Sequence, residues 1–251
     1  MKKNSWLLIT TLFLLGVLAC KASESSIQTA IAQTQTAQPT LTQTPTPRPT
    51  PTPTAALLYA EDFSDPLSGW ETKINQNDPD SRFGYLEGEY HISRLAGQDL
   101  VSWAYAHQDF DDAVLSVDTR HVSGESVGTS AAVSWRVAPD FSSYYTLYIT
   151  GASQFYVNKF NNKVNTPVHE WKTSSAILRG QKVNHIDIYF VDDVSIIYIN
   201  NVRIAIFNDS SSLHGDIWLG AAGTKTSGVE IAFDNLTVHS ADEAPLDTNK
   251  P

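Results

Sequence analysis

The residues best suited to chemistry stand on the polar sides of alternating segments. Residues 113–120 place Leu115 and Val117 on one face and polar side chains on the other. The same alternation recurs in residues 129–137, 144–149 and 183–190. The polar positions of these segments hold Asp118, Arg120, Arg136, Tyr144, Tyr148, His185 and Asp187. A sugar site needs aromatic rings for the apolar side of a pyranose and planar charged groups for its hydroxyls. If these strands are neighbours, the pattern predicts one ligand-binding face; a solvated sheet face, on which Tyr and Thr are simply good strand formers, is the alternative.

These segments belong to a long series of short strands. Further strands are expected at 88–93, 100–106, 154–160, 194–199, 202–207, 216–222 and 229–238. Turn residues separate them, among them Pro139-Asp140, Asn161-Asn162 and Asn200-Asn201. No stretch shows sustained helical periodicity. The sequence therefore predicts an all-β domain over residues 56–240, built as a two-sheet antiparallel β-sandwich.

Several motifs, in their order and spacing, resemble bacterial concanavalin A-like jelly-roll domains of the laminin-G and glucanase type. They are Asp62-Phe63-Ser64-Asp65-Pro66 with Gly69-Trp70, Gly88-Glu89-Tyr90-His91-Ile92, Tyr144 to Ile149, Ile197-Tyr198-Ile199-Asn200-Asn201, Gly220-Ala221-Ala222-Gly223, and Ala232 to Val238. The match extends over nearly all of residues 58–239. The resemblance implies a jelly roll and a role connected with carbohydrate, because relatives include lectin-like, family 16 glucanase-like and 3-keto-disaccharide hydrolase-like domains. Fold alone does not fix which of these applies.

The glutamates argue against one particular mechanism. The resemblance to family 16 glucanases would require Glu-x-Asp-x-x-Glu on one strand, and none of the glutamates in residues 56–251 begins that pattern. Retaining hydrolysis needs two carboxyl groups about 5–5.5 Å apart. Sequence-distant carboxylates can still meet in a sandwich, so catalytic residues stay unassigned. The domain is expected to bind without catalysis.

Acidic turns raise the question of a cation. Asp78, Asp80, Asp109 and Asp111 stand in oxygen-rich loops that a structural calcium ion could use. Solvated turns in which aspartate caps the backbone are the favoured alternative. No histidine pair has a zinc-binding spacing, and the chain has a single cysteine. No other cofactor is expected.

The first 20 residues resemble a bacterial lipoprotein signal. Lys2 and Lys3 precede a short apolar run, which is too short for the ~20 residues of a spanning helix. Val17-Leu18-Ala19-Cys20 is similar to a lipobox. The resemblance implies a signal peptide over residues 1–19 and a lipid on Cys20. A cleaved secretory signal with a free thiol is the alternative.

Composition divides the rest of the chain. Residues 20–55 are rich in Thr, Gln and Pro and are typical of an extended linker, whereas residues 241–251 form an acidic tail expected to be disordered. Residues 1–54 hold four of the chain's 17 basic and one of its 27 acidic residues, which leaves 13 and 26 for the domain, a net charge of about −13. Such a surface repels phosphate backbones, so nucleic acid is excluded as a partner.

Together these features predict an exported, membrane-anchored lipoprotein whose sandwich binds extracellular polysaccharide or oligosaccharide. Two alternatives stay open. One is a glycoside-active hydrolase of the 3-keto-disaccharide hydrolase-like type. The other is a structural module of the cell envelope that contacts a protein partner.

Overall fold

The computed structural model of the protein describes residues 55–72 and 78–241. The predicted signal peptide, Cys20, nearly all of the linker and all but the first residue of the tail lie outside the described residues. Within them the regular structure consists of fourteen strands. None of the described segments is a helix long and apolar enough to cross a bilayer.

Eight strands form one sheet. In the order in which they pair they are β12 (Val202–Asn208), β11 (Val194–Ile199), β10 (Val183–Val191), β5 (Ala113–Gly124), β14 (Val229–Ser240), β3 (Glu89–Arg94) and β2 (Ser81–Leu86), with β1 (Leu57–Glu61) also pairing with β14. All pairings are antiparallel.

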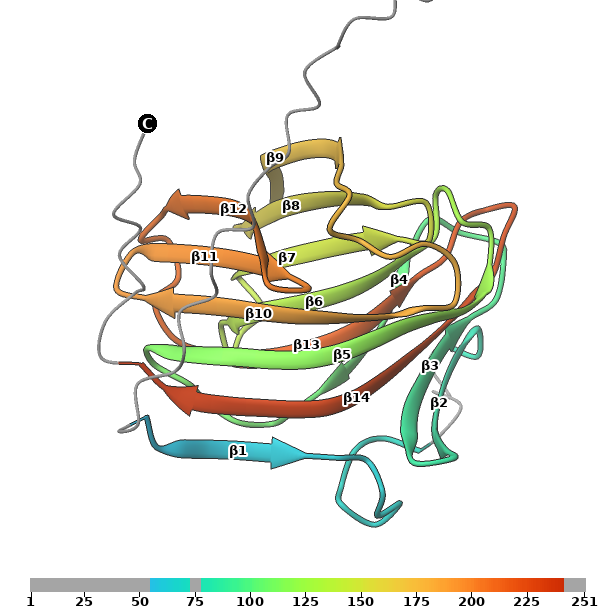
Figure 1. Cartoon of the computed structure of the whole chain (residues 1–251), viewed down its shortest axis with the longest axis horizontal. Helices are drawn as coiled ribbons and strands as arrows, with labels where there is room; N and C mark the ends of the chain where they lie inside the picture. Colours follow the sequence, from blue (N-terminus) through green and yellow to red (C-terminus); the bar gives the residue numbers. More distant parts are fainter. Residues whose placement is uncertain (1–54, 73–77, 242–251) are drawn as a thin grey trace, which may run out of the picture. The chain divides into compact units, whose positions relative to one another are not determined.

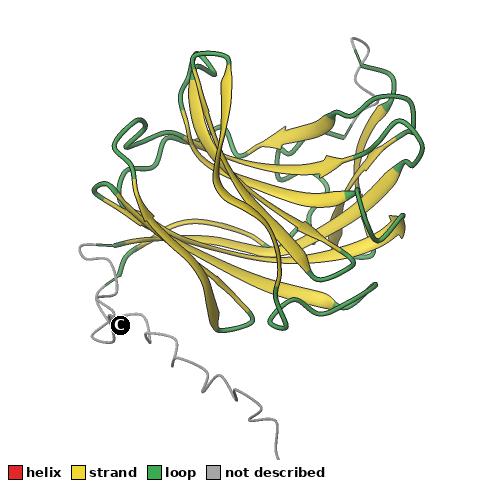
Figure 2. Cartoon of the chain, turned by 90° about the horizontal axis from the view of Figure 1, so that it is seen from above, coloured by secondary structure: helices red, strands yellow, loops and turns green. Residues whose placement is uncertain are grey.

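Six strands form the second sheet. Their order is β4 (Val101–Tyr105), β13 (Asp216–Ala222), β6 (Ser130–Val137), β7 (Ser143–Thr150), β8 (Gln154–Asn161) and β9 (Val164–Thr173). In Figure 1 strands β10, β5 and β14 lie in front of this sheet, and Figure 2 shows the strands gathered into two layers. The predicted two-sheet antiparallel sandwich is confirmed.

The core lies between the two layers and follows from the alternation. Leu115 and Val117 of β5 are fully buried and face the other sheet, from which Trp135 and Leu147 point back. Each buried aliphatic or aromatic side chain of this kind contributes roughly 1.5–3 kcal/mol of transfer free energy. One continuous apolar layer therefore fixes the position of both sheets.

Eleven of the fourteen strands coincide with predicted ones, and β1, β2 and β9 were not predicted. An edge position alone is not the reason, because β4 and β12 also pair with a single strand each and were predicted. The side chains of β9 are mostly exposed on both faces, and Pro167 interrupts its sequence. An edge strand tolerates a proline, whereas the sequence pattern reads it as a break.

Candidate functional site

The predicted polar face is divided between the two sheets. Asp118 and Arg120 lie on β5 and His185 and Asp187 on β10, in the eight-stranded sheet. Tyr144 and Tyr148 lie on β7, in the six-stranded sheet. The expectation that these strands form one sheet is therefore corrected. The two groups face outward on opposite sides of the sandwich.

Arg136 faces the interior, which corrects its assignment to a ligand-binding face. A register shift opposite Asp216 and Trp218 interrupts the ladder, and Arg136 has a φ of 52°, so strict alternation does not apply there. The guanidinium is fully buried and lies 5.4 Å from the centre of the Phe190 ring. It donates to the Asp112 carboxylate (3.0 Å) and to the backbone carbonyl of residue 192 (2.6 Å).

The polar groups on the eight-stranded sheet bind one another. His185 Nδ1 lies 2.6 Å from Asp118 Oδ1, and its Nε2 lies 3.2 Å from Asp187 Oδ1. Ser116 donates to the same oxygen of Asp187, and Asn235 donates to Asp118. Beside them, Arg120 is ion-paired with Glu89. These interactions join β5, β10, β14 and β3. We therefore interpret the residues as a hydrogen-bonded network that stabilises the sheet.

The same network makes stability depend on pH. Hydrogen bonds to Asp118 and then to Asp187 raise the pKa of His185 from 6.5 to about 9. The imidazolium therefore stabilises the folded state fully below pH 6.5, and this contribution is lost as pH rises toward 9. We expect the melting temperature of the wild type to fall between pH 6.5 and 9, and His185→Gln to remove most of that slope. His214→Gln, which alters a more exposed histidine paired with Asp109, should keep the wild-type slope; equal slopes in wild type and His185→Gln would contradict the assignment.

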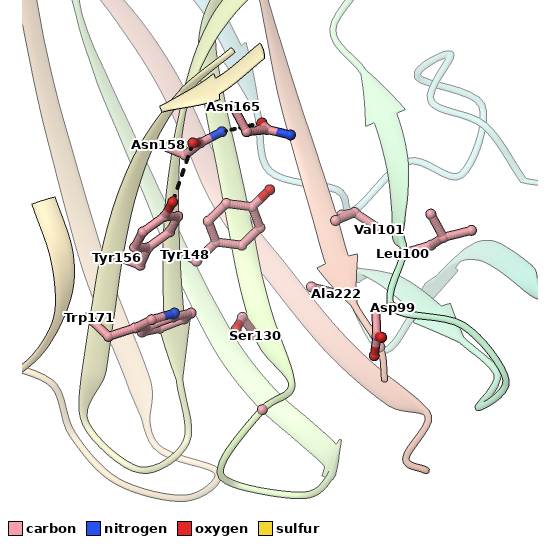
Figure 3. Close-up of a pocket in the computed structure, with 12 residues that line it drawn as sticks. Asp99, Leu100, Val101, Ser130, Tyr148, Tyr156, Asn158, Asn165, Trp171 and Ala222 are labelled. Atoms are coloured by element: carbon pink, nitrogen blue, oxygen red, sulfur yellow. Dashed lines mark hydrogen bonds between the residues drawn. The ribbon is translucent and has the colours of Figure 1, made fainter. Parts of the chain in front are cut away.

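The outer face of the six-stranded sheet carries a hollow of about 430 Å³. Every strand of this sheet contributes to it, as Figure 3 shows for most of the lining side chains. The lining residues are Asp99, Leu100, Val101, Gly128, Ser130, Tyr148, Tyr156, Asn158, Asn165, Trp171, Ala222 and Gly223. Alternation explains their position, since Leu147, Ile149, Phe155 and Val157 on the same strands point into the core.

Aromatic rings form one wall of this hollow. Tyr156 and Trp171 are stacked, with ring centroids 5.2 Å apart and planes inclined by 22°. Tyr148 lies next to Tyr156, at 6.0 Å between centroids. The Trp171 side chain is on the edge strand β9, and the residue is 47% exposed. A stacked pair that leaves so much indole surface in contact with solvent presents an apolar platform to a ligand.

Amide groups lie beside this platform. Asn158 Nδ2 donates to Asn165 Oδ1 (2.8 Å), and Asn158 Oδ1 accepts from the Tyr156 hydroxyl (3.4 Å) (Figure 3). Asn158 is 4% exposed, so its orientation is fixed by these contacts. Burial raises the pKa of the Tyr148 hydroxyl, which stays protonated at neutral pH. The hollow thus offers neutral donors and acceptors next to an aromatic surface.

Charge is sparse around the hollow. Asp99 is the one carboxylate among its lining residues, and it pairs with Lys225 at 3.5 Å and accepts from the Lys225 backbone N–H. The outward positions of the central strand β6 are taken by small residues, Ser130, Ala132 and Ser134. Within the lining of this hollow there is consequently no pair of carboxyl groups of the kind that retaining glycosidases use.

A serine motif at the β5–β6 connection has a structural explanation. Residues 124–128 read Gly-Glu-Ser-Val-Gly, the pattern of a nucleophile elbow. They connect β5 of the eight-stranded sheet to β6 of the six-stranded sheet, whereas an elbow joins a strand to a helix. His121 on β5 bonds to Thr129 Oγ1 (2.8 Å). The motif is therefore explained by this connection, in which Gly124 and Gly128 both have a positive φ.

The acidic turns that suggested calcium have other contacts. Asp78 accepts from Ser81 Oγ and from Arg94, both at 2.7 Å, and Asp109 is paired with His214. The remaining two, in turns that precede β2 and β5, are Asp80 and Asp111. In the described part of the chain no group of three or more His, Cys, Asp or Glu is placed to hold a metal ion. Calcium binding stays a prediction to be tested.

Of the predicted residues, only Tyr148 lines the hollow. Tyr156 and Asn158 follow the same alternation on β8 and could have been found by it. Trp171 and Asn165 lie on β9, which was not recognised as a strand.

The sequence matches no protein-family model and no curated protein. Solved structures are similar in fold: a carbohydrate-binding module from Bacillus subtilis has a TM-score of 0.55 at 19% identity, over 68% of this chain and 96% of that one. A Bacillus subtilis protein of unknown function with a galectin-like fold has a TM-score of 0.58 at 10% identity, over 74% and 96%. A β-glucanase from Bacillus licheniformis has a TM-score of 0.55 at 12% identity, over 75% and 99%. The chain therefore has the concanavalin A-like jelly-roll fold.

Proposed function

We propose that this domain is a non-catalytic carbohydrate-binding module that binds a glycan in the hollow of the six-stranded sheet. The observation that carries the proposal is the stacked Tyr156–Trp171 pair, which lines the hollow while Trp171 stays about half exposed. Flat aromatic surfaces suit the C–H faces of pyranose rings. The fixed amides of Asn158 and Asn165 suit the hydroxyl groups at the ring edges.

The charges favour a neutral glycan. No lysine or arginine is among the lining residues, and Asp99 would repel carboxylated or sulfated sugars. The domain's net charge of about −13 adds to that repulsion. We therefore expect uncharged polysaccharides or oligosaccharides to bind in preference to anionic ones.

The same lining supports the proposal of binding without hydrolysis. A retaining mechanism needs one carboxylate as nucleophile and a second carboxyl as acid. Asp99 alone cannot fill both roles. An inverting mechanism also needs two carboxyl groups. The hydrolase alternative would therefore require a carboxylate outside the lining of the hollow, and it is tested by looking for products.

The sequence also predicts where the domain acts. A lipid on Cys20 would hold the protein at a membrane, and the Thr/Pro-rich linker would hold the domain away from it at ~3.1 Å per residue in the proline-rich part. In this proposal the module recognises glycan outside the cytoplasm.

The lipid anchor gives a direct prediction. Cys20→Ala removes the acylated thiol, and each buried acyl methylene is worth ~0.8 kcal/mol of membrane affinity. We expect the wild type to incorporate labelled palmitate and the variant to incorporate none. A variant that is still labelled would show that Cys20 is not the lipidated residue.

The proposed function is tested with purified residues 21–251 and a panel of soluble and insoluble polysaccharides, with and without calcium. Retention and product formation are scored in the same samples. Retention on neutral glycans without products would support a binding module. Products would establish the hydrolase alternative, and neither retention nor products would favour a protein partner. A loss of retention on calcium removal would support a calcium site.

A further inference from the structure

A second group of aromatic side chains lies on the same outer face as the hollow, at the other end of the strands. Its centre is Trp218 on β13, whose ring centroid lies 4.8 Å from Tyr105, 5.2 Å from Phe141 and 5.6 Å from Tyr144. Phe160 of β8 extends the group by stacking on Tyr144 at 4.7 Å with an interplanar angle of 16°. We call these five residues the Trp218 cluster. Their neighbours Ile217, Leu219 and Tyr145 face the core, so the cluster is extra to it.

The cluster and the hollow are two ends of one surface. Tyr144 and Tyr148 lie four residues apart on β7 and face the same side, which separates them by about 13 Å at the usual rise per residue. Between them the strands carry Ala132, Thr146 and Gly220, all of which are buried. A Cβ at Gly220 would lie 2.5 Å from the ring of Trp103. The glycine thus lets Trp103 lie close against the backbone between the two ends.

Phe141 has a conformation that packing alone does not explain. It has a φ of 60°, which is a genuine outlier for a bulky residue, and it is 58% exposed. Its backbone N–H bonds to the carbonyl of Ala138 (2.8 Å) in the turn between β6 and β7. Strain of this kind costs on the order of 1–3 kcal/mol and gathers at ligand-contacting sites. Here it holds an exposed ring against Trp218.

A hydrogen bond also fixes the Trp218 indole. Its Nε1 donates to Asp216 Oδ2 (3.3 Å), and Asp216 accepts from the backbone N–H groups of His107 and Gln108. The carboxylate is thereby used to fix the platform. Trp218 itself is only 6% exposed, so its role is to hold in place the more exposed rings packed against it.

From these observations we infer that the Trp218 cluster is a second sugar subsite, and that the ligand is a neutral glycan chain long enough to reach from the hollow to Phe141. The inference rests on the proposed function and adds to it the class of ligand. A mono- or disaccharide would occupy the hollow alone. A longer chain would cross Trp103, which is partly exposed and lies against Gly220, and end on the exposed ring of Phe141.

The test measures affinity against chain length. The probes are oligosaccharides of one to six units, prepared by partial hydrolysis of the neutral polysaccharide that residues 21–251 retain. The variant is Phe141→Gly, because glycine accepts the positive φ without strain. The matched control is Leu67→Gly, which removes an 89% exposed side chain from a turn elsewhere in the domain.

The wild type and Leu67→Gly should bind longer chains progressively more tightly. Phe141→Gly should bind the shortest probes as the wild type does and lose about tenfold in affinity for the longest, as expected for an aromatic contact. Its melting temperature should be equal to or above that of the wild type. If Phe141→Gly binds chains of every length as the wild type does, the second subsite is overturned, whether or not the melting temperature falls. Phe141 would then serve only to cover Trp218. Failure of the proposed function is a different result, in which no neutral polysaccharide is retained at all.

Discussion

Replacing Trp171 by alanine is expected to weaken glycan binding by about 30-fold or more, the loss typical of a central aromatic contact. The indole is the outermost ring of the stacked pair and is 47% exposed. Without it, Tyr156 loses its partner and the hollow loses one wall. Stability should change little, because β9 is an edge strand that pairs only with β8. Isothermal titration and thermal unfolding on the same samples check both statements.

Two further variants define what the Trp171 result means. Trp171→Phe keeps a flat ring at this position and should recover part of the affinity. Val164→Ala shortens another exposed side chain at the opposite end of the same edge strand and should bind like the wild type. If Trp171→Ala binds normally, or if Val164→Ala is equally impaired, the hollow is not the binding site.

The fold could be predicted because its signal is local and repeated. In strands such as β5 and β7 every second residue is buried, so a short stretch of sequence is enough to identify them. Strand β9 was not predicted because it is mostly exposed on both faces and contains Pro167. Its sequence therefore shows no alternation of apolar and polar residues.

The site was harder to predict because its residues are assembled by pairing between distant strands. Asp118 and His185 are opposite each other in the β5–β10 ladder, although 67 positions separate them in the chain. The alternation predicted that both side chains face outward, but it did not indicate which strands are neighbours in the same sheet. The polar residues were consequently collected into one face, whereas the structure separates them from Tyr144 and Tyr148.

Arg136 shows a second limit of the pattern. Alternation places it beside Ser134 on the outer face, but the bulge in β6 turns it inward, where it meets Asp112 and the Phe190 ring. Bulges depend on the opposing strand, here β13, and leave little trace in the sequence of β6 itself. One of the two arginines of the predicted face is thereby part of the interior.

Asp112→Ala should accordingly be among the most damaging single substitutions, lowering the free energy of unfolding by about 3 kcal/mol. The Arg136 side chain is fully buried, so removing its carboxylate leaves an uncompensated interior charge. Asp112 also accepts from the backbone N–H of Asp192 (2.8 Å), a bond that is lost with it. Its partial exposure keeps the expected effect at the lower end of the range for buried pairs. Urea unfolding measures the effect.

The double variant Asp112→Ala with Arg136→Met separates charge from packing. Replacing both members of a buried ion pair by apolar groups is often neutral, so the double variant should recover much of the lost stability. Asp109→Ala, which breaks an exposed pair with His214, should cost less than about 1 kcal/mol. A double variant as unstable as Asp112→Ala would contradict the charge argument. Glycan binding by the folded double variant should equal that of the wild type, since Arg136 lies in the interior and the glycan is expected on the outer face of the six-stranded sheet.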